Sequence, residues 1–164
     1  MRNRREFLKT AAGSAAATLL SLETVSGQNN PRRVDVHHHF QTPMDTNPNL
    51  KFWTPEKSLE QMDKFGTETA MISHPGDEAY DGTEKGRAFA RAVNEYGAKI
   101  VSGNRKRFGL LAILPMRDVD GTLKEIEYAL DTLKADGFQI LSNTGEKWPG
   151  SPTYLPIFQE FLPI

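Results

Sequence analysis

The sequence contains no cysteine among its 164 residues. This absence excludes thiol nucleophiles, thiolate zinc sites and disulfide bonds together, so any metal ion must be held by histidine and carboxylate side chains. An excess of charge of one sign is also missing, since 20 Lys and Arg oppose 21 Asp and Glu for a formal net charge of −1. Such a chain has no built-in attraction for nucleic acid, and a small molecule is the expected partner.

Long hydrophobic runs and glycine-rich phosphate loops are lacking too. The weakly apolar run at residues 11–20 is too short to cross roughly 30 Å of hydrocarbon, so no stable membrane span is expected. The absence of a glycine-rich loop after any expected strand argues against nucleotide-binding α/β folds. With 38% hydrophobic and 25% charged residues the composition is nevertheless that of an ordinary globular protein.

The N-terminal segment resembles a bacterial twin-arginine export signal. The residues that carry the likeness are Arg4, Arg5, Phe7 and Leu8. The apolar run at 11–20 and a cleavage site near Val25-Ser26-Gly27 follow in the order of an export signal. We therefore expect residues 1–27 to be a signal peptide read by the twin-arginine export machinery, which would make the protein periplasmic or secreted. An amphipathic N-terminal helix with a chance arginine pair is the alternative.

Replacing Arg4 and Arg5 with lysine tests the export signal. The resemblance implies that both guanidinium groups are read by the export machinery, so the Lys-Lys variant is expected to stay in the cytoplasm. Cell fractionation followed by immunoblotting measures the distribution. Normal periplasmic accumulation of the variant would contradict the signal assignment.

The rest of the chain, residues 28–164, alternates segments typical of strands and helices. Expected strands cover residues 33–40, 68–73, 108–114 and 137–141, and the expected helices run from 55 to Gly66 and cover 83–101, 118–135 and 154–161. Strand starts separated by roughly 30–40 residues indicate parallel βα units. Eight such units would have the size of a (β/α)₈ TIM barrel, so about four units predict its N-terminal half. A small open α/β sheet is the alternative.

Chemistry is concentrated in the first expected strand, which reads Val-Asp-Val-His-His-His-Phe at 34–40. Strict alternation along a strand would place Asp35, His37 and His39 on one face, and Val34, Val36, His38 and Phe40 toward the helices. Two imidazoles on one face can share a metal ion, so His37 and His39 are the candidate ligands.

Other interpretations of this strand stay open at this point. The histidines could be a tag remnant, an exposed loop or hydrogen-bonded core residues. We expect His38 to be structural. Asp35 would either orient an imidazole or make a polar contact at the start of the strand.

Three further residues are candidate substrate contacts. His74 follows the second expected strand, at the rim where barrel enzymes build their active sites. Trp53 and Trp148 lie in the loops after the first and fourth strands and could line a pocket for a flat substrate. The alternatives are a loop histidine without a role and aromatic packing under a long loop.

With these motifs, the sequence is similar to the amidohydrolase-related decarboxylases, a group that includes aminocarboxymuconate-semialdehyde and salicylate-type decarboxylases. The likeness spans residues 33–161. The matching segments are Asp-Val-His-His-His-Phe at 35–40, Trp-Thr-Pro-Glu at 53–56, Met62-Asp63 with Gly66, Arg-Phe-Gly at 107–109, Leu-Pro-Met at 114–116, Gly-Phe-Gln-Ile at 137–140 and the loop holding Trp148. The resemblance implies a metal-dependent TIM barrel.

The resemblance also implies a divalent metal, usually Zn²⁺, held by the histidine pair of the first strand, a histidine of the fifth strand and an aspartate of the eighth. A histidine of the sixth strand would assist catalysis. Only His37 and His39 have counterparts here, and we expect the domain to be truncated before the fifth strand. The catalytic residues of the family would then lie beyond Ile164.

Three functions follow from this interpretation. The preferred one is a non-oxidative decarboxylase, a carboxy-lyase, whose substrate is an aromatic or enoic carboxylic acid. A metal-dependent hydrolase on the same fold is the second, because both chemistries use the same histidine pair. The third is a truncated, catalytically inactive fragment, whose open sheet edges and uncovered helix faces would favour aggregation or pairing with a partner half, or a homodimer.

Overall fold

The computed structural model describes residues 32–45 and 52–161. The predicted signal peptide, residues 1–27, lies outside the described residues, whereas the segment from Arg33 onward forms a compact unit of its own. Among the described residues, no helix combines the length and the apolar character that a membrane crossing requires.

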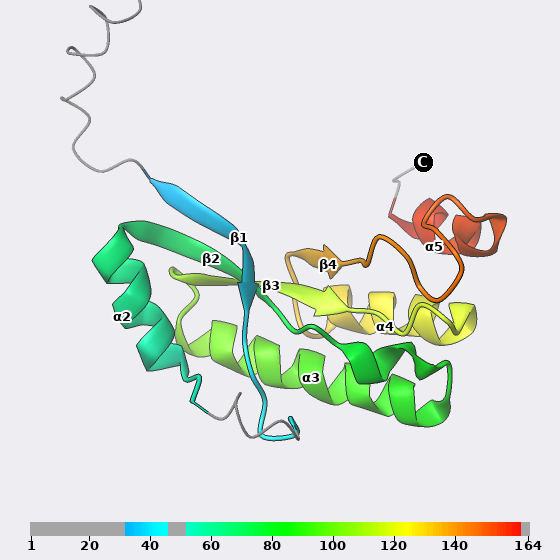
Figure 1. Ribbon diagram of the computed structural model, residues 1–164, viewed down its shortest axis with the longest axis horizontal. Helices are drawn as coiled ribbons and strands as arrows, with labels where there is room; N and C mark the ends of the chain where they lie inside the picture. The colour runs from blue at the N-terminus through cyan, green and yellow to red at the C-terminus, as the bar shows by residue number, and fades with distance from the viewer. Residues whose placement is uncertain (1–31, 46–51, 162–164) are drawn as a thin grey trace, which may run out of the picture. The chain divides into compact units, whose positions relative to one another are not determined.

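Four parallel strands form one sheet in the order β1-β2-β3-β4 (Figure 1). The strands are β1 (Arg33–His39), β2 (Thr67–Ser73), β3 (Phe108–Ile113) and β4 (Gly137–Gln139). The helices are α2 (Pro55–Phe65), α3 (Glu84–Gly103), α4 (Val119–Asp131) and α5 (Leu155–Glu160), with short 3₁₀ turns η2 (Asp77–Asp81) and η3 (Pro152–Tyr154). Sequential strands that pair in parallel through helical crossovers are the first half of a (β/α)₈ barrel, which confirms the predicted α/β fold.

Helices α2, α3 and α4 begin within one residue of where the sequence predicts, because each of the three has a side chain that caps its free N–H groups. Thr54 Oγ1 accepts from the N–H of Lys57 at 3.3 Å, and Thr83 and Asp118 cap α3 and α4 in the same way. Gly66 ends α2 in the left-handed conformation, with φ of 70°. These local signals fix the helix starts without help from the rest of the fold.

The core lies between the sheet and helices α2, α3 and α4, which all cover the same face of the sheet (Figure 1). Ala70 and Ile72 of β2 pair in register with Phe108 and Leu110 of β3, and all four are at most 2% exposed. Phe40, directly after β1, is equally buried. Removing these side chains from water is the main stabilising contribution, at about 25 cal/mol per Å² of apolar surface.

Two predicted boundaries at the C-terminal side are wrong. Helix α4 ends at Asp131 and not at Ala135, because the chain turns at Lys134, whose φ of 56° is left-handed. The N–H of Ala135 then donates to the carbonyl oxygen of Ala129 at 2.9 Å and closes the helix end. Strand β4 is correspondingly short and ends at Gln139 instead of Leu141.

Strand β1 departs from the alternation that its sequence predicts. Its pairing with β2 shifts between Asp35 and His38, where β1 carries one more residue than its partner. This bulge puts Asp35 on the same face as His38, toward α2, and not beside His37 and His39 as predicted. Val34 and Val36 consequently turn away from the helices and are 56% and 67% exposed.

Candidate metal centre

The His37 and His39 imidazoles lie together at the C-terminal end of β1. Their ring centroids are 4.7 Å apart with the ring planes at 73°. His39 Nδ1 lies 3.3 Å from the carbonyl oxygen of Ser73 and 3.4 Å from its hydroxyl. In the tautomer that donates to the carbonyl oxygen, Nδ1 carries the proton and Nε2 keeps its lone pair. A metal-binding imidazole is usually oriented in this way, and His39 is therefore prepared to bind through Nε2.

Asp35, His38 and Ser58 form a chain of hydrogen bonds that fastens helix α2 to strand β1. Asp35 Oδ2 lies 3.0 Å from His38 Nδ1, and His38 Nε2 makes a short contact with Ser58 Oγ. The order resembles a Ser-His-Asp triad. Ser58, however, is only 5% exposed, in the first turn of α2 against the sheet. This chain of hydrogen bonds thus anchors α2 to β1. The position of His38 agrees with the predicted structural role of this residue.

Asp35 also controls the bulge that aims the candidate ligands. Its Oδ1 accepts the backbone N–H of His37 at 3.0 Å, while Oδ2 binds His38. The carboxylate therefore holds both residues of the irregular segment and leaves His37 beside His39. One of the two roles predicted for Asp35 is to orient an imidazole. Asp35 does orient one, but it is the imidazole of His38.

The Asp35→Asn variant is expected to lose stability in a pH-dependent way. The hydrogen bond from His38 holds the pKa of the Asp35 carboxyl below its ordinary value of 3.8. A depressed pKa means that the ionised carboxylate stabilises the fold above that value and stops doing so as the pH falls through the folded-state pKa. The deficit of the variant should therefore be larger at pH 6 than at pH 3, as measured by urea unfolding. Glu60→Gln, on the exposed side of α2, is the control, and a deficit that is independent of pH would contradict the role of Asp35.

His74 is buried at the end of β2, with 3% exposure, and both of its ring nitrogens are engaged. Nδ1 accepts the N–H of Gly76 at 3.0 Å, so the proton resides on Nε2, which lies 2.9 Å from Asp45 Oδ1. Asp45 in turn accepts from the backbone and hydroxyl of Thr42. His74 thereby ties the loop after β1 to the end of β2, and its predicted contact with substrate stays a prediction.

The two tryptophans occupy different surroundings. Trp53 packs its ring on Phe40, with centroids 6.3 Å apart, which corresponds to aromatic packing under the loop. Trp148 is 67% exposed in the loop after β4. Trp53 and His74 both lie against Phe40, the residue that follows His39. The substrate-binding roles of Trp53, His74 and Trp148 remain predictions.

The candidate ligands are fewer than a complete metal site requires. In the described ranges, no group of three or more His, Asp or Glu side chains is arranged to hold a metal ion. His37 and His39 fit a divalent metal as two neighbouring imidazole donors, and a catalytic site generally needs a third protein ligand. Sequence reasoning missed Asp45 and Ser58, although an acidic residue three positions after Thr42 is a signal for a local side-chain turn.

Comparisons with known proteins identify the family of the chain. The family model described as amidohydrolase matches residues 34–161. Decarboxylase yanB of Aspergillus niger is 36% identical over 146 residues, which cover 78% of this chain and 40% of that protein. The 6-methylsalicylic acid decarboxylase of Penicillium expansum is 31% identical, with 78% and 44% coverage. The chain thus spans less than half the length of these curated relatives.

Solved structures share the fold. The 5-carboxyvanillate decarboxylase of Novosphingobium aromaticivorans, solved with bound manganese and a nitrobenzoic acid ligand, superposes with a TM-score of 0.70 at 16% identity. The match covers 82% of this chain and 49% of that one. The sheet order, the first-strand histidine pair and the family match over most of the chain together lead to one conclusion: the chain belongs to the amidohydrolase family.

Proposed function

We propose that the protein is a metal-dependent, non-oxidative decarboxylase of an aromatic or enoic carboxylic acid. The observation that carries the proposal is the position of His37 and His39 on one face at the end of β1, in a chain whose curated relatives are named as decarboxylases. A hydrolase on the same fold would use the same pair, and the names of the relatives favour the decarboxylase.

The residues of this chain would divide the work between binding and positioning. His37 and His39 would hold a divalent metal, with the Ser73 carbonyl fixing the tautomer of His39. Asp35 keeps His37 in place through the backbone of the bulge. His74 and Asp45 fix the loop after β1, so that the rim beside the histidine pair keeps its shape.

The metal, when bound, would orient the substrate carboxylate and stabilise negative charge that develops as a proton replaces the departing CO₂. Zn²⁺ is the ion that the sequence resemblance suggests, and Mn²⁺ is the ion in the structural neighbour. Two imidazoles suit either ion. We further propose that Trp53 and Trp148 border the substrate and that the protein is exported by the twin-arginine machinery.

Release of CO₂ from hydroxybenzoates tests the proposed reaction. The full chain, supplied with Mn²⁺ or Zn²⁺, is incubated with carboxyl-¹³C 6-methylsalicylate or 2,6-dihydroxybenzoate, and labelled CO₂ is followed by NMR. The proposal expects metal-dependent CO₂ release that the His37→Ala and His39→Ala variants lack. Amides and lactones are assayed in parallel, since hydrolysis of these without CO₂ release would identify a hydrolase and overturn the decarboxylase.

A further inference from the structure

Helices cover the four-stranded sheet on one face only. The covered face carries Ala70, Ile72 and Leu110, which are buried in the core. Side chains alternate along a strand, so Met71 of β2 and Leu111 of β3 point to the opposite face. Among the described residues, no helix lies over that opposite face (Figure 1).

This open face is apolar over most of its length and ends in the candidate metal ligands. It consists of Val34, Val36, His37 and His39 of β1, Met71 of β2 and Leu111 of β3. The two valines are 56% and 67% exposed, and Met71 and Leu111 are half-buried. Large apolar side chains gathered on an uncovered sheet face mark a contact surface.

Long and small residues stand side by side on the open face. Met71 pairs with Gly109 and Leu111 pairs with Gly137. A Cβ at position 109 would meet Met71 Sδ at 2.6 Å, and one at position 137 would meet Leu111 Cδ2 at 3.2 Å. The long side chains therefore lie against the glycines of the next strand. Such pairing of long with small residues is typical of the tapered interior of a small barrel.

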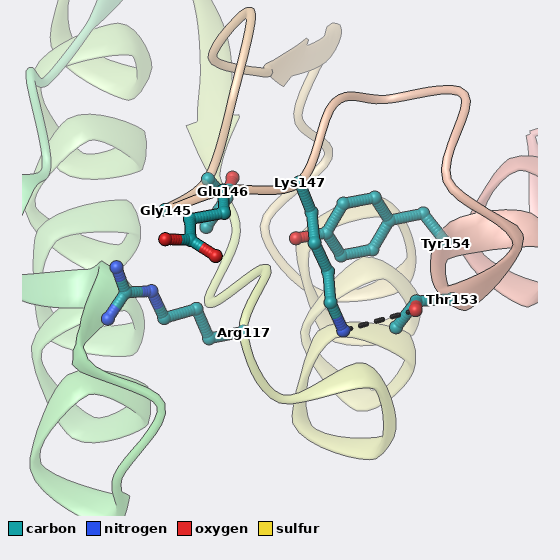
Figure 2. A pocket seen from close by; sticks show the side chains of 7 residues that line it. Arg117, Gly145, Glu146, Lys147, Thr153 and Tyr154 are labelled. Atoms are coloured by element: carbon teal, nitrogen blue, oxygen red, sulfur yellow. Dashed lines mark hydrogen bonds between the residues drawn. The ribbon is translucent and has the colours of Figure 1, made fainter.

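Both edges of the sheet are free to pair in the described part of the chain. Strands β1 and β4 have one neighbour each and run parallel to the others. The loop after β4 turns away, because Lys147 Nζ donates to Thr153 Oγ1 at 3.1 Å beside the turn η3 (Figure 2). Phe161 stacks on Phe138, which lies on the helix-covered side, with ring centroids 5.2 Å apart. Neither contact occupies the backbone groups at the edge of β4.

A second copy of this chain fits both the open face and the free edges. Four parallel strands are half of the eight at which a parallel α/β sheet closes. A two-fold axis along the strands would place β1 of each copy beside β4 of the other, so that both edges pair in the parallel sense. The match to the manganese-bound decarboxylase structure covers 49% of that chain, so two copies have the extent of one such chain. Closure would leave no free edge.

We propose that two copies of this chain close into one eight-stranded barrel, in which their histidine pairs meet at a shared metal site. The interior of an eight-stranded barrel is just wide enough for side chains to fill it, so the imidazoles of the two β1 strands converge at the same end. The second copy then supplies the third ligand that His37 and His39 lack among the described residues. The shared metal rests on the proposed function, whereas the closure of the barrel does not.

Sedimentation equilibrium of the full chain tests the closure. A dimer that does not grow further with concentration is expected. Val36→Lys and Leu111→Lys should each raise the dimer dissociation constant at least about tenfold, because each places a charge inside the barrel. Ala88→Lys adds the same charge to an exposed position of α3 and is the matched control. Circular dichroism checks the folding of each variant, and Met71→Lys replaces Leu111→Lys if the latter does not fold.

Metal analysis of the purified dimer tests the shared site. One Mn²⁺ or Zn²⁺ ion per two chains is expected. The double variant His37→Ala, His39→Ala should lose the metal and remain a dimer, because the apolar face and the strand edges hold the copies together.

The closure and the shared site fail in different ways. A chain that stays monomeric, or assemblies that keep growing with concentration, would overturn the barrel even if metal binds. Dissociation by Val36→Lys but not by Leu111→Lys would mean that two β1 edges pair, and would also overturn it. One ion per chain would overturn the shared site and leave the proposed function in place. A dimer that binds neither ion would overturn the shared site together with the metal-dependent function.

Discussion

Replacing Asn94 with alanine is expected to lower the free energy of unfolding by about 3 to 5 kcal/mol. Asn94 is 1% exposed and joins α3 to both β3 and α4. Its Nδ2 donates to the Ile113 carbonyl at 2.9 Å and to Glu125 Oε1 at 2.8 Å, and its Oδ1 accepts the Ile113 N–H at 2.9 Å. Alanine would leave the backbone of Ile113 without its partners and remove a donor from a buried carboxylate.

Glu125 makes this loss depend on pH. Burial raises the pKa of its carboxyl above the ordinary value of 4.5, although Asn94 and Arg91, which donates at 2.8 Å, both act in the opposite direction. A raised pKa means that the folded state favours the protonated carboxyl, so stability falls as the pH rises through the folded-state pKa. Without Asn94 the ionised form is disfavoured further, and the deficit of Asn94→Ala should be larger at pH 7 than at pH 5.

Urea unfolding at both pH values measures the free energy of unfolding and so tests this prediction, with Asn143→Ala as the matched control. Asn143 is exposed, and among the described residues its side chain donates only to the Gly145 carbonyl, so its replacement should cost less than about 1 kcal/mol. Asn94→Asp is a second test, because it keeps the volume but places an acceptor against the Ile113 carbonyl and a second negative charge beside Glu125. Equal stability of Asn94→Ala and Asn143→Ala would show that the network contributes little.

Removing either imidazole of the histidine pair is expected to lower the affinity for Mn²⁺ and Zn²⁺ at least about a hundredfold. Loss of a group that merely orients a ligand costs about ten- to a hundredfold, and loss of a ligand itself should cost more. The ring centroids of His37 and His39 are 4.7 Å apart, and removing either ring would leave each chain with a single imidazole at the site. One imidazole in water competes poorly with the hydration of a divalent ion.

Isothermal titration and metal analysis of the purified chain measure this effect. His38→Ala is the adjacent control, because its ring points to Asp35 and Ser58 and not to its two neighbours. That variant should lose stability and still bind metal below its melting temperature. Stoichiometric metal retained by the double variant His37→Ala, His39→Ala would remove the pair from the site.

The sequence was sufficient to predict most of the secondary structure and the fold. Thr54, Thr83 and Asp118 mark helix starts through contacts within a few residues, and Gly66 ends a helix by its own backbone freedom. Such signals act locally, so they do not depend on the rest of the chain. The boundary at Lys134 was missed because a left-handed turn at a non-glycine residue has no comparable signal.

The candidate site was predictable only in part. Two histidines at alternate positions of one strand predict a pair on one face, and the 4.7 Å between their rings agrees with that. The position of Asp35 was predicted wrongly, since one extra residue in a ladder reverses the faces of all residues before it. The sequence does not show where such a residue will be inserted.

The amino-acid sequence by itself determined the βα order, the helix caps and the identity of the histidine pair, because these depend on residue type and on spacing along the chain. Only the tertiary structure decided what lies beside that pair. The bulge of β1 against β2, the burial of His74 against Asp45 and the contact of His38 with Ser58 all join segments distant in sequence. Contacts of that kind arise when strands pair and loops meet at the rim of a sheet, so no local pattern records them.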